Sequence, residues 1–495
     1  MTSQNFGKMI LLQHKIIALF VCIFCVQVID AQEVKVLTLE TFLTEAVNRN
    51  PEKLRADLDR QAVRLEAEIF AANLKPQLTG FANFPNYART FQEVVQPDGT
   101  IAFQSVRNNN SSVSLSATQR LSATGGLFFL RTELQRFDDF ENDKFQYNGL
   151  PFRLGFQQTI FGWNEWKAEK KMQPVRLSAA EKKYLYDTEQ IRLEAVRIYF
   201  NLLSVTQDLE IAEVNQQNNR ELLQIAEERY AAGKISENSL LQLQLESARA
   251  AKNKAAAALA VRLASAAVRN YLSEPSDGTI FRPVPPEDLK IREIDPDAAV
   301  NYARNHRFET DNYLLQIMEA EAELTRTQRE NGLNMNLNAS IGFSRSAQDI
   351  NTIYTDPQNE QFLQLALSVP ILDWGRRKAL VQQRTLTADY TVRATEQARI
   401  ELDTEVRNSV LRLQTAQEQL KLATVQREIA EKRFNIAKES FILGAISVTE
   451  LGIARQERDF AQRDYILTLS DYRESYHVLR RNTLYDFATG TKIKQ

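Results

Sequence analysis

Two matching segments decide the fold of this 495-residue chain: IFGWNEWKA at residues 160–168 and ILDWGRRKA at residues 371–379. The second segment lies 211 residues after the first. The same offset of 211 relates Gly233 to Gly444 and Ser236 to Ser447 farther along the chain. Because a single inserted residue would break this constant offset, helices of equal length are expected in both halves. The chain is therefore one structural unit written twice.

Alternating strands precede each of these segments. Residues 333–344 alternate apolar side chains with Asn, Ser and Gly, which is the period-2 pattern of a strand with one apolar and one polar face. We expect strands at about residues 77–160 in the first repeat and 333–372 in the second. The first repeat has about 48 additional residues in this part of the chain, and its surplus strand region lies at about residues 121–146.

Long helical hairpins follow each segment. Apolar residues recur at steps of three and four, which is the spacing of a coiled-coil seam. The first helix would be on the order of 100 Å long at about 1.5 Å per residue. At each tip a Gly suits a helix C-terminus and a Ser suits the next N-cap, and Ser447 with Glu450 fits a capping box. The predicted hairpins span residues 163–272, with a tip at 231–236, and residues 374–485, with a tip at 442–447.

The predicted organisation is a signal segment, two repeats joined by a Pro-rich linker, and a short tail. Each repeat begins with a helix, at about residues 38–75 and 297–331. The boundaries are residues 1–31, 32–272, 273–296, 297–485 and 486–495.

The balance of charges gives no sign of a nucleic-acid-binding protein, which would carry a net positive charge. Lys and Arg number 61 against 63 Asp and Glu, which gives a formal net charge of −2. After residue 31, no apolar run approaches the roughly 20 residues that a membrane helix needs. If the mature chain enters a membrane, it must do so as strands.

A secretory signal is predicted at residues 1–31, because two lysines precede an apolar run and Ala31 offers a cleavage site. Both cysteines, Cys22 and Cys25, lie inside this segment, so a chain cut after Ala31 has no thiol. A lipid anchor on Cys25 is the alternative. Phe24 stands where lipoprotein signals usually carry a small residue, and cleavage without an anchor is therefore preferred.

The duplicated pattern resembles the TolC family of outer-membrane efflux proteins from about Leu37 to Asp486. The motifs that carry the resemblance are LTLE at residues 37–40 with Asn50-Pro51, VPILDWG at residues 369–375, and the paired Gly tips. The implied fold is mainly α with β: long antiparallel helical hairpins form a trimeric α-barrel joined to a shared transmembrane β-barrel. Each chain of the family gives four strands to a 12-stranded barrel, so the surplus region at 121–146 is expected outside the shared wall.

The resemblance implies a passive exit duct in the outer membrane, with a helical tunnel in the periplasm. Its partners would be two further copies of the chain, outer-membrane lipid, a periplasmic adaptor (membrane fusion protein) and an inner-membrane RND or ABC transporter. Physical reasoning also favours an oligomer, since two strand pairs cannot close a barrel and open edges are not tolerated in lipid. Two alternatives remain: the exit duct of a type I protein secretion system, and a non-conducting coiled-coil protein of the envelope.

No residue pattern indicates catalysis, a cofactor or a metal site, so the protein is not expected to be an enzyme. The family places acidic rings one turn past the second tip; Glu450 matches the first such position and Ile453 the second. Ser239 and Ile446 stand where the family can place a polar lock, which makes a lock of that kind doubtful. The candidate site residues are Glu450, Ile453 and Ser239 for the periplasmic gate, Ala232, Gly233, Lys234, Leu443, Gly444 and Ala445 for adaptor contact, and Trp163, Trp166 and Trp374 for an aromatic belt at the membrane interface.

Overall fold

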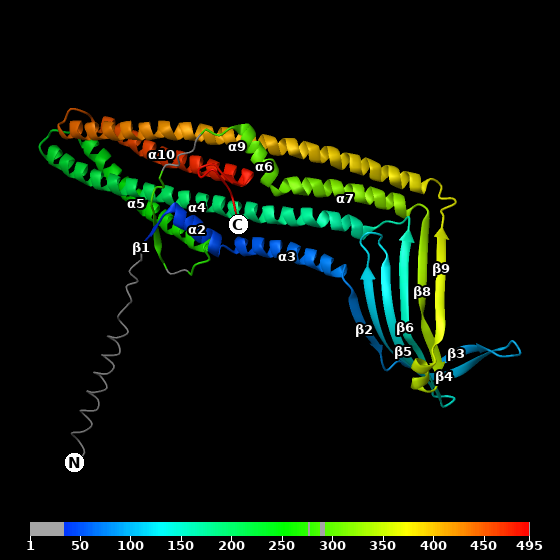
Figure 1. Cartoon of the computed structure of the whole chain (residues 1–495). Coiled ribbons are helices and arrows are strands. Elements are labelled where there is room, and N and C mark those ends of the chain that lie inside the picture. The colour runs from blue at the N-terminus through cyan, green and yellow to red at the C-terminus, as the bar shows by residue number, and fades with distance from the viewer. Residues whose placement is uncertain (1–33, 276–277, 288–292, 495) are drawn as a thin grey trace, which may run out of the picture.

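The computed structural model of the protein describes residues 34–275, 278–287 and 293–494. Long helices form most of the molecule, and a sheet extends from one end of them (Figure 1). The predicted signal segment, with Cys22 and Cys25, lies outside the described residues.

Each repeat begins with two helices where the sequence pattern predicts one. In the first repeat the break falls at Asn50-Pro51, where the Asn50 side chain accepts a hydrogen bond from the Glu52 backbone N–H at 2.8 Å and so caps the next helix. In the second repeat Arg307 occupies the matching break and makes no cap bond. The helices are α2 (Leu39–Arg49), α3 (Pro51–Asn73), α6 (Pro296–His306) and α7 (Phe308–Glu330).

Two long hairpins carry the length of the molecule. Their outgoing helices have 67 residues each, or about 100 Å at ~1.5 Å per residue. The equal lengths follow from the constant offset between the repeats. The four helices are α4 (Glu165–Ala231), α5 (Glu237–Tyr271), α9 (Arg376–Ile442) and α10 (Val448–Thr483).

The largest hydrophobic core lies where the two repeats meet, along the middle of α4 and α9 and the C-terminal parts of α5 and α10. Tyr199 of α4 is fully buried there, and its hydroxyl donates to the Leu37 carbonyl at 3.1 Å. The predicted linker contains a short strand, β7 (Ile280–Pro283), which pairs in parallel with β1 (Val34–Leu37). The linker thus closes the core by pairing with the start of the described chain.

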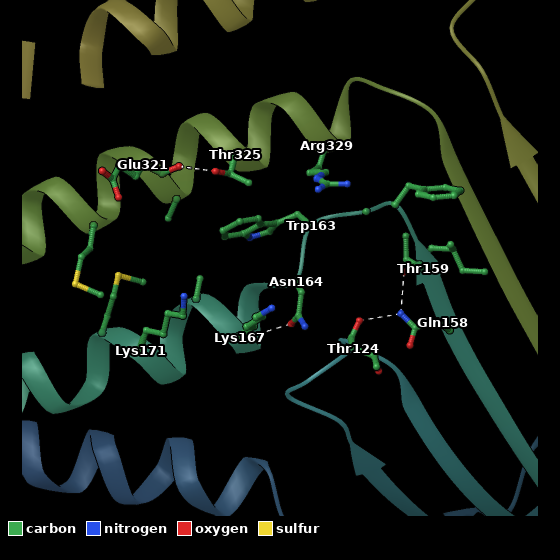
Figure 2. Close-up of a pocket in the computed structure, with 17 residues that line it drawn as sticks. Thr124, Gln158, Thr159, Trp163, Asn164, Lys167, Lys171, Glu321, Thr325 and Arg329 are labelled. Carbon is green, nitrogen blue, oxygen red and sulfur yellow. Dashed lines mark hydrogen bonds between the residues drawn. The ribbon is translucent and has the colours of Figure 1, made fainter. Parts of the chain in front are cut away.

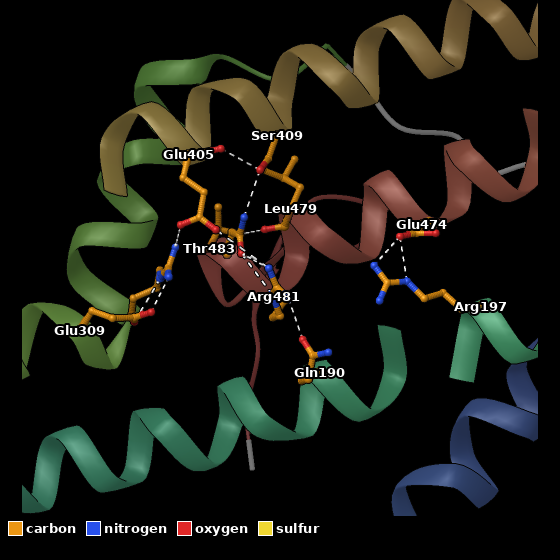
Figure 3. A network of polar contacts seen from close by, with 11 residues as sticks. Gln190, Arg197, Glu309, Glu405, Ser409, Glu474, Leu479, Arg481 and Thr483 are labelled. Atoms are coloured by element: carbon orange, nitrogen blue, oxygen red, sulfur yellow. Dashed lines mark hydrogen bonds and ion pairs between the residues drawn. The ribbon is translucent and has the colours of Figure 1, made fainter. Parts of the chain in front are cut away.

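Polar links within and between the repeats lie beside this core (Figure 3). Arg307 is only 6% exposed at its side chain and pairs with Glu405 of α9 at 2.7 Å. Arg481 of α10 donates to Gln190 of α4 at 2.6 Å. The bond from Arg481 to Gln190 joins the two halves of the chain, whereas the pair of Arg307 and Glu405 ties the α6–α7 break to α9 within the second half.

The tail after α10 forms a small hairpin of β10 (Tyr485–Asp486) and β11 (Thr491–Lys492). The ring of Tyr485 stacks on Tyr302 of α6 at a centroid distance of 3.9 Å. The last described residues are therefore tied to the helical body.

The sheet has seven strands among the described residues, six of which follow one another in the order β2-β4-β5-β6-β8-β9, while β3 pairs only with β4. Every neighbouring pair is antiparallel. A short helix, α8 (Ile350–Thr355), lies in the loop between β8 and β9. The strands are β2 (Gln77–Asn83), β3 (Tyr87–Val95), β4 (Ile101–Arg120), β5 (Leu127–Asp139), β6 (Lys144–Ile160), β8 (Asn334–Ala347) and β9 (Gln358–Ser368).

One prediction about the surplus region is wrong. Residues 121–146 were expected outside the wall, but β5 lies in the middle of the sheet between β4 and β6. The segment that projects is β3 with residues 101–109 of β4 (Figure 1). The error arose because β4 is 20 residues long and pairs with β2 and β3 in succession, which its alternation pattern does not reveal.

His477 predicts a measurable pH dependence of stability. Its side chain is buried on α10, and desolvation, followed by the charges of Arg480, Arg473 and Arg192, lowers the pKa of His477 to about 3. In the unfolded chain the pKa is about 6.5. Below pH 6.5 the unfolded state therefore binds a proton that the folded state does not, and the free energy of unfolding should fall by about 2 kcal/mol between pH 7 and 5.

The test compares denaturant midpoints of wild type and His477→Gln at pH 7 and pH 5. The substitution should remove most of the loss on acidification. His306→Gln is the control, because its ring is only partly buried and should contribute less. Equal pH slopes for wild type and His477→Gln would contradict the assignment.

Candidate channel site at the helix tips and the strand–helix junctions

Both tips end their first helix in the same backbone motif. Gly233 has φ +66° and Gly444 has φ +79°, the left-handed conformation that favours glycine. The N–H of the residue after each Gly reaches back five residues: Lys234 donates to the Arg229 carbonyl at 2.8 Å, and Ala445 does so to Ser440 at 2.9 Å. This is the Schellman pattern, which satisfies carbonyls at a helix end. The sequence predicted both turns from the Gly positions.

The second helix of each hairpin starts with a serine cap, but the two caps differ. Ser236 accepts from the Ser239 N–H at 3.2 Å. Ser447 accepts from the Glu450 N–H at 3.2 Å, and the Glu450 carboxylate accepts in return from the Ser447 N–H at 2.7 Å. The Ser447 backbone N–H, followed by the Ser447 hydroxyl, donates to this carboxylate and so lowers the pKa of Glu450 below its usual range. The predicted capping box is thus present in the second tip, with its carboxylate exposed.

The tip turns are exposed above a small apolar cluster. Leu443 is 84% exposed, and the other five candidate contact residues are also exposed. A cluster beneath them joins both hairpins: Leu222, Ala226, Leu243, Phe434, Phe441 and Leu451. The two turns are therefore fixed relative to each other by buried side chains, while their outer surface is free of contacts within the described chain.

Polar contacts that the sequence analysis missed tie the hairpins together just behind the tips. Arg455 of α10 donates to Asn219 of α4 and to Glu246 of α5, each at 2.8 Å. Asn215 of α4 donates to Asp459 of α10 at 2.6 Å. Their partners are about 210 to 240 residues apart in sequence, and a single sequence carries no signal for such pairs. The spacing of charged residues along α10 does not distinguish a face that meets solvent from the face that contacts α4 and α5.

Ser239 and Ile446 do not form a polar lock. The Ser239 hydroxyl lies 3.0 Å from that of Ser236, within its own turn. Ile446 packs against the apolar cluster of the tips. Ile453 is half exposed on α10, one turn after Glu450.

The tryptophans lie where strands pass into helices. Trp163 lines a cavity of about 790 Å³ between α4 and α7, together with Lys167, Lys171 and Arg329 (Figure 2). Asn164 fixes this junction: its Oδ1 accepts from the Lys167 N–H at 3.1 Å, which caps α4, and its Nδ2 donates to the carbonyl of Ser122 in the β4–β5 turn at 3.0 Å.

The other two tryptophans have different surroundings. Trp166 stacks on Phe70 at 5.8 Å and has the Arg120 guanidinium over its ring at 4.9 Å. Trp374 is 90% exposed. Trp166 therefore packs the joint between α3 and α4, whereas Trp374 is available to another surface.

None of the described helices is long and apolar enough to cross a membrane. The described ranges also contain no cluster of three or more His, Cys, Asp or Glu side chains placed to hold a metal ion. The candidate site therefore consists of the two turns at the helix tips and, at the other end of the long helices, the junctions between strands and helices.

Known proteins share this architecture. Residues 306–483 match the sequence model of the outer membrane efflux protein family. The structure is similar to the CmeC outer membrane channel of Campylobacter jejuni, with a TM-score of 0.64 at 15% identity over 92% of this chain and 87% of CmeC. The outer-membrane channel OprN gives a TM-score of 0.65 at 16% identity, over 92% of this chain and 91% of OprN. The outer membrane protein VceC of Vibrio cholerae gives a TM-score of 0.63 at 16% identity, over 92% of this chain and 97% of VceC.

No curated protein matches the chain in sequence. The predicted fold class is nevertheless confirmed by the solved channels, and the match to the outer membrane efflux protein family supports the resemblance over residues 306–483. The sheet has seven strands among the described residues, which is more than the four per chain that the resemblance implies.

The left-handed turn at Gly444 predicts opposite effects for two glycine substitutions on the same hairpin. At Gly444 a Cβ would meet nothing within 4 Å, so Gly444→Ala should cost only backbone strain, about 1 kcal/mol. Gly452 lies inside α10 and is equally open, so Gly452→Ala should stabilise the helix by about 0.5–1 kcal/mol. Amide hydrogen exchange over the first turns of α10 should speed up in the first variant and slow down in the second. A change in the same direction in both would refute the strain argument.

Proposed function

We propose that this protein, which has the fold of TolC-like channels and a second repeat that matches the outer membrane efflux family, is the outer-membrane exit duct of a tripartite efflux system. Drugs, dyes and detergents would pass through it from a periplasmic adaptor and an inner-membrane pump, with no chemistry on the way. The observation that carries the proposal is the combination, in one chain, of two 67-residue helices with turns at one end and a two-faced sheet at the other.

The two faces of the sheet suit a wall between lipid and water. On one face apolar side chains line up across the strands; for example Ile341 of β8 lies opposite Leu154 of β6, and both are exposed in the single chain. On the other face Asn338 lies opposite Gln157 and Gln364. A spacer protein in water would have no use for an exposed apolar face of this extent. This feature disfavours the non-conducting alternative.

A homotrimer would complete the wall and the tunnel. Among the described residues β2 and β9 pair along one side only. Backbone groups at such edges must be paired in lipid, so other copies of the chain would have to supply the missing neighbours. The family channels, which are not enzymes, are the precedent for this assembly.

The tips would face the periplasm and meet the adaptor. Their six candidate residues are exposed and carry one charge, that of Lys234, so a docking partner would contact mostly backbone and small side chains. At the opposite end of the helices Trp163 and Trp374 would lie at the membrane interface, where Trp is enriched. The cations Lys167, Lys171 and Arg329 beside Trp163 would suit the headgroup level.

A deletion strain tests the proposal against the type I secretion alternative. Loss of the gene should raise susceptibility to dyes and detergents and leave the set of secreted polypeptides unchanged, and the plasmid-borne gene should restore resistance. The protein itself should migrate as an SDS-resistant, heat-modifiable trimer from the outer membrane. Unchanged susceptibility together with a lost secreted polypeptide would favour the secretion duct; a periplasmic monomer would exclude both.

Glu450 predicts the ion selectivity of the periplasmic mouth. Three copies would place three carboxylates around one axis and favour cations. Glu450→Gln keeps a capping side chain but removes the charge, so the cation preference of single channels in planar bilayers should fall severalfold. Hydrogen bonds from Ser447 depress the pKa of Glu450, so its carboxylate stays charged at the usual Glu pKa of about 4.3. The cation preference of the wild type should therefore still be present at that pH, and it should be lost only at lower pH, when Glu450 is protonated.

Glu237→Gln is the matched control, since Glu237 is an exposed carboxylate in the first turn of α5 at the other tip. Its removal should leave the preference nearly intact. Equal losses in the two variants would show that general tip charge, and not the Glu450 position, sets the selectivity.

A further inference from the structure

We propose that each chain contributes six strands, and not four, to the shared barrel, so that a trimer forms an 18-stranded wall closed by pairing β9 of one copy with β2 of the next. This inference rests on the proposed trimeric duct. It adds to that proposal a specific interface between copies and a wider exit.

Strand β5 pairs along both sides within the six-strand path. Each of its neighbours pairs with it over nearly its whole length, from Leu127 to Asp139. Leu130 faces the apolar side, opposite Ala117 of β4 and Leu154 of β6. At 13 residues β5 exceeds the roughly 9–11 that a membrane-spanning strand needs.

Contacts on the opposite, polar face also tie β5 to its neighbours. Phe129 of β5 lies over Gly155 of β6, where an added Cβ would come within 2.1 Å of the phenyl ring. Next to it Arg131 stands opposite Arg153 of β6, and Arg153 reaches across Gly342 of β8 to pair with Glu360 of β9. The chain of contacts from β5 to β9 is thus continuous, and removing β5 would leave Gly155 as a gap in the wall.

The two edges of the six-strand path are also complementary. Six antiparallel strands in a row place the two edge strands in opposite directions, so β9 of one copy meets β2 of the next as another antiparallel pair. Each edge also carries an exposed aromatic residue on the otherwise polar face: Phe81 on β2, 62% exposed, and Phe362 on β9, 50% exposed. Two such rings brought together across an antiparallel pair would bury each other.

A wider exit is the functional consequence. Barrel diameter grows roughly linearly with strand number, so 18 strands give a barrel about 1.5 times as wide as 12. Barrels of 16–18 strands leave an aqueous channel. The narrow part of the duct would then lie at the helix tips and not in the membrane.

Cysteine variants test the interface and the strand count on the full-length protein in outer membranes. Both native cysteines precede residue 32, so cleavage of the signal leaves a thiol-free background. Phe81→Cys with Phe362→Cys should form disulfides between copies and give covalent dimers and trimers on reducing-agent-free gels. The control pairs Phe81→Cys with Ser340→Cys, because Ser340 lies directly opposite Phe362 but one strand inside the edge. It should give no covalent trimer.

Labelling with a membrane-impermeant maleimide decides whether β5 belongs to the wall. Leu130→Cys would face lipid and Arg131→Cys the aqueous lumen, since neighbouring residues of a strand point to opposite faces. In intact membranes Arg131→Cys should label about tenfold faster, because a thiol in lipid cannot ionise, and detergent unfolding should abolish the difference. Equal labelling, or cross-linking of the control pair alone, would overturn the six-strand wall.

The same variants separate this inference from the proposed function. Each is also scored for SDS-resistant trimers and for resistance to dyes in the deletion strain. Working trimers with equal labelling at 130 and 131 would leave the duct intact and refute the 18-stranded wall. Failure of the wild-type gene to form an outer-membrane trimer would refute the duct itself.

Discussion

Backbone hydrogen bonding at the edges of the sheet is the constraint on which the rest of the structure depends. A six-strand path with one apolar and one polar face leaves the N–H and C=O groups of β2 and β9 without partners in the described chain. Lipid offers no water to satisfy them, and each unpaired group would cost several kcal/mol. In the proposed duct the chain would therefore form part of a closed wall, and the helices would have to arrange several copies around one axis.

Duplication meets this requirement with local features. Both outgoing helices have 67 residues and end at a left-handed Gly, so both tips reach the same level. The apolar cluster behind the tips and the contacts of Arg455 lock the hairpins side by side. At mid-length the buried hydroxyl of Tyr199 joins α4 to β1, the first described strand. Helices fixed relative to each other at the tips and at mid-length also fix the relative positions of the strands that continue from their other end.

The sequence predicted those features that are local and failed where pairing is distant. Gly233, Gly444 and the Ser447–Glu450 box identify the tips because a turn depends on residues within five positions of it. The breaks at Asn50 and Arg307 were missed: Asn50-Pro51 carries the signal of a helix start, an N-cap Asn followed by Pro, whereas Arg307 makes no cap bond and carries no such signal. The place of β5 was wrong because alternation states which face a side chain takes, but not which strand lies beside it. Gly155 held the relevant signal, as a strand glycine often marks the close approach of another group, here the ring of Phe129.

A wide barrel lumen would determine which part of the duct discriminates between solutes. The polar face of the sheet is rich in Ser, Asn and Gln, and Arg153 is already paired with Glu360, so it offers a solute few unpaired charges. An 18-stranded lumen of this kind would impose little discrimination. At the second tip, by contrast, the Glu450 carboxylate of each copy would stand on a turn fixed by its own capping bonds. Discrimination would therefore depend on the periplasmic end and on the partner docked there, while the membrane end would only have to stay closed to lipid and open to water.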